Sequence, residues 1–412
     1  MNGYIRDFVT AMRNHNHLMD NSISLIASEN VMSSHVKEAL ISDLGNRVAE
    51  GWLGERIFPG LTYYDYIEEL GMRLIKEALN ASFVDLRPIS GTHANMVLYT
   101  AFTQPKDIII SYPIKNGAHI SMSGATPRKM FSLNVEEFSI KEDGFTIDVE
   151  KSIDKIKKSH PKLVIFGGSV ILQPQNIDEI IYFCQQNSII TVYDASHVIG
   201  LILGDCYYNP LDKGVDLMTF STCKTIPGPQ HAMIVTRRDD LGEIIKKTTF
   251  PATVSGHHLH ETVAAIIAFD EMMQFGKEYS KQIVSNAREL GKQLILAGFE
   301  PYCIGKELTS THMLLIKNHL NMPIDDVVKK LEQANIMVNK NMLPCNTSYK
   351  DCSGLRLGTP EVTRLGMKEP EMKEIATFIQ RVLLYGDRTE SVKKDVIDFR
   401  SKFQTIHYSY EF

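Results

Sequence analysis

The sequence has little net charge and no long apolar run. Its 412 residues include 44 Lys and Arg against 49 Asp and Glu, which gives a net charge of −5. This balance argues against a surface for nucleic acid or for an anionic membrane. No segment is apolar over the length of a membrane-spanning helix, and the first residues lack the basic-then-apolar pattern of a signal peptide. We therefore expect a cytoplasmic protein of two or three domains, with neither a nucleic-acid nor a membrane partner.

Cysteine is scarce and scattered. The six cysteines form no CxxC pair and have no spacing to histidine of the kind that metal sites show. They are typical of reduced thiols in a cytoplasmic protein. The group His257-His258-x-His260 resembles a set of metal ligands, but residues so close along a chain rarely converge on one ion. We predict no metal.

The most informative stretch runs from residue 189 to 235. It reads as three short apolar strands, at Ile189–Tyr193, Val215–Ser221 and Ala232–Thr236. Asp194 follows the first strand and Lys224 follows the second. A lysine amine can bond to the aldehyde of pyridoxal 5'-phosphate, and a carboxylate can keep the pyridine nitrogen protonated, so that the ring accepts electrons. The alternative is that both charges merely cap buried strands. The pair together favours the cofactor.

Residues 160–194 predict a strand, a helix and a second strand, a pattern typical of a largely parallel sheet with helices on both faces. Ligands of such sheets bind where the strands end, and Ser169, Asp194, His197 and Lys224 all follow strands. Ser90-Gly91-Thr92 precedes a helix, where free N–H groups would suit a phosphate, although it is also an ordinary helix cap.

A glycine-rich stretch at residues 45–60 carries Glu50 and the only tryptophan, and it reads as a functional loop or an interface. For Glu50 alone, a solvated loop acid is the commoner case. After two long helices, at about 260–274 and 279–297, residues 298–386 read as a smaller α+β unit. In it, Arg356 is either a buried ion-pair partner or a clamp for a carboxylate.

Eight motifs, taken together, resemble the serine hydroxymethyltransferase family over essentially the whole chain. They are LIASEN (25–30), NRVAEG (46–51), SGTHAN (90–95), NGAHIS (116–121), YDASHVIGL (193–201), STCKT (221–225), VNKN (338–341) and SGLRLGTP (353–360). The resemblance implies an α/β protein of fold type I. It would have a large domain with a mainly parallel seven-stranded sheet, and a smaller C-terminal α+β domain. We expect an N-terminal arm with helices over 1–45, the large domain over 46–276 and the small domain over 277–412.

The resemblance also implies a role for each matching residue. Lys224 would bond to the cofactor, Asp194 would pair with its ring nitrogen and His119 would stack on the ring. The other cofactor contacts would come from Ser90, Gly91, Thr92, Ser169, His197, Ser221, Ser255 and Gly256. Arg356 and Ser28 would bind the amino acid carboxylate, with Phe58 also at the substrate. Glu50 would handle the proton of the substrate's β-hydroxyl. A homodimer would share the site, with Glu50 and Gly256 acting in the partner's half.

The chain departs from the family pattern on the substrate side. Val48 stands where the family usually has a tyrosine, and Ile57-Phe58-Pro59 replaces Tyr-Tyr-Gly. Cys223, Gln230 and Ser255 replace a histidine, an arginine and a glycine. Each buried phenol donor that is lost removes about 1–3 kcal/mol if it was used. The changes suggest an altered acceptor.

Three hypotheses remain open. The first is hydroxymethyl transfer between serine and glycine through a glycine quinonoid, with tetrahydrofolate as the one-carbon carrier. The second is a threonine-aldolase or transaldolase reaction without folate, which joins the glycine carbanion to another aldehyde; the apolar Ile57 and Phe58 favour it. The third is a regulatory dimer that binds pyridoxal phosphate without turnover. The joint presence of Glu50, Lys224, Asp194 and Arg356 argues against the third.

Overall fold

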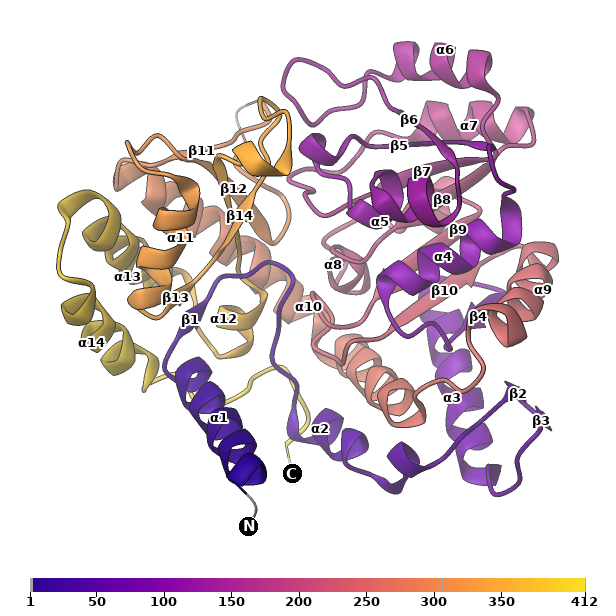
Figure 1. The fold of residues 1–412 in the computed structure, drawn as a ribbon, viewed down its shortest axis with the longest axis horizontal. Coiled ribbons are helices and arrows are strands. Elements are labelled where there is room, and N and C mark those ends of the chain that lie inside the picture. Colours follow the sequence, from indigo (N-terminus) through magenta and orange to yellow (C-terminus); the bar gives the residue numbers. More distant parts are fainter. Residues whose placement is uncertain (1–2, 306, 412) are drawn as a thin grey trace. The chain divides into compact units, whose positions relative to one another are not determined.

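The chain forms two compact units, shown by the computed structural model over residues 3–305 and 307–411 (Figure 1). The larger unit comprises Asn30–Lys281 and the chain from Tyr408 onward. The smaller unit comprises the chain up to Glu29 and Gln282–His407.

A seven-stranded sheet forms the centre of the larger unit. Its strands lie in the order β4-β10-β9-β8-β7-β5-β6. They span Phe83–Asp85 (β4), Ile108–Ser111 (β5), Asn134–Glu137 (β6), Leu163–Gly167 (β7), Ile190–Asp194 (β8), Leu217–Ser221 (β9) and Ala232–Thr236 (β10). Strands β6, β5, β7, β8 and β9 are parallel, whereas β10 is antiparallel to both of its neighbours. The predicted mainly parallel seven-stranded sheet is therefore confirmed.

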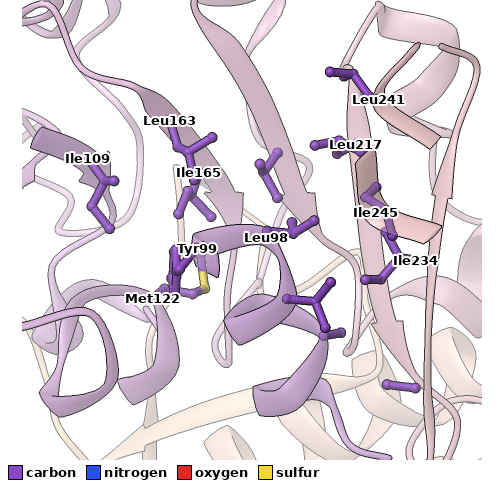
Figure 2. Packing of buried hydrophobic residues seen from close by; sticks show 14 of the residues in the cluster. Leu98, Tyr99, Ile109, Met122, Leu163, Ile165, Leu217, Ile234, Leu241 and Ile245 are labelled. Carbon is purple, nitrogen blue, oxygen red and sulfur yellow. The ribbon is translucent and has the colours of Figure 1, made fainter. Parts of the chain in front are cut away.

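Apart from the exposed edge strand β6, the strands are buried on both faces, which explains their apolar runs. Figure 2 shows one face, where Ile109, Leu163, Leu217 and Ile234 pack against side chains of the covering helices. The helices of this unit are α2 (Ser34–Leu40), α3 (Thr62–Leu79), α4 (Gly91–Phe102), α5 (Ile120–Ser123), α6 (Val149–Ser159), α7 (Asp178–Gln186), α8 (Ile199–Leu203) and α9 (Asp239–Lys247). Leu98 and Tyr99 of α4 and Ile245 of α9 lie in this core.

One tight turn brings two strand ends together. Gly167 ends β7 with φ +88, a conformation that side chains with a Cβ rarely adopt. A Cβ at this position would lie 2.1 Å from the carbonyl oxygen of Asp194, at the end of β8. Glycine is therefore required here, because the backbones at the ends of β7 and β8 approach too closely to leave room for a Cβ.

The two long helices predicted at 260–274 and 279–297 are a single helix, α10 (Leu259–Leu296). The prediction of two helices was wrong because a glycine inside a helix costs only about 1 kcal/mol and does not by itself end it. Gly276 sits inside α10, and a Cβ there would lie 3.0 Å from the methyl group of Met272.

The smaller unit is an antiparallel sheet with helices, as predicted. Its four strands lie in the order β11-β12-β15-β14 and span Glu300–Pro301, Met313–Lys317, Gly354–Gly358 and Asn339–Asn341. A separate parallel pair joins β1 (Ile23–Ser24) to β13 (Ile336–Met337). The helices are α1 (Gly3–Asp20), α11 (Ile324–Gln333), α12 (Pro360–Arg364), α13 (Glu369–Gln380) and α14 (Thr389–Arg400).

The limits of the units differ from the domains expected at 1–45, 46–276 and 277–412. The first 29 residues group with the smaller unit, because β1 pairs with β13 and the Arg400 side chain donates to the carbonyl of Ser22 at 3.0 Å. Among the residues that the structure describes, no helix is both long enough and apolar enough to cross a membrane. The cytoplasmic location stays a prediction.

Candidate active site

Asp194 ends β8 and is fixed on both carboxylate oxygens. Its Oδ2 accepts a hydrogen bond from Asn95 Nδ2 at 2.9 Å, and its Oδ1 accepts one from the backbone N–H of Ser196 at 3.1 Å. The side chain is 5% exposed. These two hydrogen bonds fix the orientation of the carboxyl group. Asp194 is therefore suited to hold a protonated ring nitrogen.

Asn95 links Asp194 to His119. The Asn95 Nδ2 donates not only to Asp194 but also to Ser121 Oγ, at 2.9 Å. Ser121 Oγ in turn lies 2.7 Å from His119 Nδ1. The Asn95 Oδ1 accepts from Thr219 Oγ1 of β9 at 3.0 Å. The His119 ring, half-buried at the start of α5, is thus held in orientation by the network that also holds the acid.

A cradle for an anion lies at the N-terminus of α4. Ser90 caps this helix by accepting from the N–H of His93, and Gly91 and Thr92 form its first turn. A Cβ at Gly91 would come 3.3 Å from Ser196 Oγ and 3.6 Å from Ser221 Cβ. The Ser221 hydroxyl oxygen is buried and makes no hydrogen bond to the described residues. A buried hydroxyl of this kind calls for a partner, and the helix N-terminus favours an anionic one.

Lys224 follows β9 in a loop that its neighbours hold in place. The carbonyl of Lys224 accepts from Asn30 Nδ2 at 2.7 Å. Thr225 Oγ1 accepts from the N–H of Gly200 at 3.0 Å and donates to the carbonyl of His197 at 3.3 Å. The lysine side chain is half-buried. Because β8 and β9 are parallel neighbours, Lys224 and Asp194 leave the sheet at the same edge, as predicted.

Ser169 and His197 lie in the loops after β7 and β8. The Ser169 N–H donates to the carbonyl of Gly117 at 2.7 Å, which places this loop beside the one that carries His119. His197 is 2% exposed. The loops after β5, β7, β8 and β9 and the start of α4 are thus interconnected at one edge of the sheet.

These residues fit pyridoxal phosphate. This cofactor requires an acid for its ring nitrogen, a lysine for its aldehyde and a site for its phosphate. The sheet edge offers Asp194, Lys224 and the anion cradle with the buried Ser221 hydroxyl, and it holds the His119 ring in a fixed orientation. Gly91 and Ser221 would hold the phosphate, and Asp194 would hold the ring nitrogen.

The segment that carries Glu50 lies beside Ser255 and Gly256. Ser255 Oγ donates to Glu50 Oε1 at 2.8 Å, and a Cβ at Gly256 would come 3.2 Å from a methyl group of Val48. A short hairpin of β2 (Gly51–Trp52) and β3 (Glu55–Arg56) follows Glu50 and was not predicted. After it, the side chain of Phe58 is 43% exposed and that of Ile57 is 62% exposed.

Arg356 and Ser28 come together within the smaller unit. Arg356 lies in β15 and is 8% exposed; its Nη2 donates to Ser28 Oγ at 3.5 Å and its Nε to Asn339 Oδ1 at 3.3 Å. Burial lowers the pKa of the Arg356 guanidinium to about 10. Ser28 and Asn339 are neutral, so a substrate carboxylate would stabilise this buried charge more than they do.

Sequence reasoning missed four residues that hold the site: Asn95, Ser121, Ser196 and Thr219. Each is buried. Three of them lie inside motifs that were recognised, and Asn95 follows Gly91 by one helical turn, which was a usable signal. Thr219 is the middle residue of the apolar strand β9, and only the structure shows that it bonds to Asn95.

The histidines at 257, 258 and 260 do not converge. His257 Nε2 lies 2.6 Å from the hydroxyl of Tyr64, whereas His258 Nδ1 lies 2.8 Å from Glu261 Oε2. The rings of His258 and His260 stack with their centroids 6.1 Å apart.

Comparisons with known proteins identify the family of this chain. The family model described as serine hydroxymethyltransferase matches residues 4–379. A serine hydroxymethyltransferase of Korarchaeum cryptofilum is 41% identical over 411 residues, covering 96% of this chain and 95% of its own length. Those of Pyrobaculum calidifontis and Methanothermobacter marburgensis are 41% and 38% identical, covering 95% and 99% of this chain and 91% and 95% of their own lengths. The chain belongs to the serine hydroxymethyltransferase family.

Proposed function

We propose that this enzyme uses pyridoxal phosphate to make or break the Cα–Cβ bond of a β-hydroxy amino acid, and that it exchanges a hydroxymethyl group between serine and glycine. The observation that carries the proposal is that Asp194 and Lys224 stand at the ends of two adjacent parallel strands, at the sheet edge where the anion cradle of α4 also lies. Family membership supports the same reaction.

The cofactor, when bound, supplies a ring that accepts the electron pair left on Cα when the Cα–Cβ bond breaks. Asp194 would pair with the ring nitrogen, and Asn95 and the Ser196 N–H hold both of its oxygens in a fixed orientation. Lys224 provides the amine that attaches the cofactor to the protein. Arg356 binds the carboxylate of the substrate with its planar fork and so orients the bond to be broken.

Glu50 takes the proton of the substrate's β-hydroxyl as the bond breaks, and returns it in the reverse direction. We propose that it does so in the site of a second copy of the chain. Ser255 bonds to Glu50, and Gly256 lies beside Val48. The segment around Glu50 also exposes the apolar side chains of Val48, Ile57 and Phe58. A homodimer would cover these side chains.

Mixed dimers test this shared site. We expect Lys224→Ala and Glu50→Gln protomers to be inactive alone and to regain part of the activity when mixed, because one of the two sites then receives both intact residues. Heterodimers that are proven by tagging but remain inactive would contradict the shared site.

The experiment that tests the reaction is a glycine assay on cofactor-loaded protein. L-serine and L-threonine are incubated separately, each with and without tetrahydrofolate. We expect glycine from serine only when the folate is present. No glycine in any tube, despite a cofactor bound to lysine, would contradict the proposal and favour a binding protein without turnover.

A second candidate is folate-independent transfer of the glycine carbanion to a larger aldehyde. The observation that favours it is the exposed apolar pair Ile57 and Phe58, in the segment where the family usually has two tyrosines. It predicts glycine from threonine without folate, and a new β-hydroxy amino acid when glycine is supplied with an apolar aldehyde.

A further inference from the structure

Residues 408–411 fold onto the larger unit. The boundary between the units falls between His407 and Tyr408, so that the chain from Tyr408 onward belongs to the unit that carries Lys224. We call residues 408–411 the C-terminal segment. Its aromatic side chains contact helix α10 at several turns, so the segment is held at defined points.

Tyr410 contacts helix α10 at Asp270 and Phe275. Its hydroxyl donates to Asp270 Oδ2 at 2.8 Å, and its ring meets Phe275 edge-on at 5.3 Å and His35 of α2 at 6.3 Å. Burial and the Asp270 carboxylate raise the pKa of Tyr410 to about 12. The phenol therefore remains a hydrogen-bond donor throughout the physiological pH range.

Tyr408 contacts helix α10 at Tyr279. Its ring packs on that of Tyr279 with the centroids 5.1 Å apart and the planes tilted by 32°. The backbone of Tyr408 has φ +57, which is unfavourable for a bulky residue. Such a conformation persists where the surroundings impose it, and here the contacts of Tyr408 and Tyr410 do so.

Tyr279 connects the C-terminal segment to the cofactor lysine. Tyr279 is fully buried, and its hydroxyl oxygen accepts from Asn30 Nδ2 at 2.9 Å. The same amide nitrogen donates to the carbonyl oxygen of Lys224 at 2.7 Å. The Asn30 Oδ1 accepts from the N–H of Val31 at 2.9 Å, which fixes the orientation of the amide.

We propose that the C-terminal segment, acting through Tyr279 and Asn30, positions the backbone of Lys224 at the edge of the sheet. Tyr408, Tyr279 and Asn30 are thus positioning residues for the lysine. The inference rests on the proposed role of Lys224, but the positioning itself is a property of the protein without cofactor. Loss of the segment would free the Tyr279 ring, loosen the amide of Asn30 and let the lysine loop open more often.

Hydrogen exchange on the protein without cofactor tests the proposal. Two variants are compared with the wild type: a chain that ends at His407, and Tyr279→Phe, which keeps the ring and removes the hydroxyl. Tyr182→Phe is the matched control, because Tyr182 is 66% exposed on α7. We expect both variants to exchange the amides of residues 222–225 about fivefold faster, the change expected from one hydrogen bond of ordinary strength. The amides of β7 should keep their wild-type rates.

A second readout is the rate at which added pyridoxal phosphate bonds to lysine, followed by absorbance, and we expect it to fall several-fold in both variants. Faster exchange in β7 as well as at 222–225 would mean general destabilisation and would overturn the proposal. Unchanged exchange at 222–225 in Tyr279→Phe would also overturn it, even if the shortened chain failed to fold. Failure of the cofactor to bond to Lys224 in the wild type would instead contradict the proposed function.

Discussion

Glu361 gives the stability of the protein a dependence on pH that the structure predicts in sign and size. The residue lies in α12 and is 6% exposed. Burial and, to a smaller extent, the nearby Glu29 raise the pKa of its carboxyl from 4.5 to about 7, against the opposing effects of Arg400 and Ser24. The folded protein therefore binds this proton more tightly than the unfolded chain does.

The sign follows from which state holds the proton. Between pH 4.5 and 7 the folded state keeps the proton and the unfolded state has lost it, so that stability decreases as the pH rises. Each pH unit in this window is worth about 1.4 kcal/mol. The contribution of Glu361 is fully present below pH 4.5, and about 3 kcal/mol of it is lost by pH 7.

The perturbation is Glu361→Gln, which keeps the shape of the protonated carboxyl and cannot ionise. Urea unfolding of the cofactor-free protein is measured at pH 5, 6, 7 and 8 for variant and wild type. We expect similar stabilities near pH 5, and a variant that is more stable by about 3 kcal/mol at pH 8. A constant difference across the range, or a wild type that is the more stable at pH 8, would refute the reasoning.

Two further predictions concern residues that support the site. Asn95→Ala removes the hydrogen-bond partner of Asp194, Ser121 and Thr219. We therefore expect urea unfolding to show a loss of about 3 kcal/mol in stability, and cofactor titration to show at least tenfold weaker binding of pyridoxal phosphate. Cofactor binding that equals the wild type would contradict the role of Asn95. Arg56→Met leaves the buried Glu68 without its cation, and we expect a loss of about 3–5 kcal/mol. The double variant Arg56→Met/Glu68→Leu should recover most of that loss in the same unfolding assay, and no recovery would show that the ion pair is not the cause.

Helices and strands that have a clear local pattern of apolar residues could be predicted from the sequence. The strand–helix–strand unit around α7 was predicted because its strands are continuous apolar runs and its helix has a helical period. Parallel pairing of those strands then places Ser169, Asp194 and Lys224 at one edge of the sheet. Both inferences need only the residues themselves and the geometry of parallel sheets.

What could not be predicted depends on contacts between distant residues. The pairing of Ile23 with Ile336 assigns the first residues to the smaller unit, and no local pattern reveals it. The orientation of Asp194 depends on Asn95, which lies 99 residues earlier. The hairpin at Gly51–Arg56 is held by ion pairs from Arg56 to Asp65 and Glu68 of α3, which compensate for its weak intrinsic strand preference.

The central claim is that Lys224 carries the cofactor, and trapping the bond tests it most directly. Cofactor-loaded protein is reduced with borohydride, digested, and mapped by mass spectrometry, with Lys224→Ala treated in parallel. We predict a single pyridoxyl group on the peptide that contains Lys224, and none in the variant. A pyridoxyl group on a different lysine of the wild type, or an undiminished adduct in Lys224→Ala, would contradict the account.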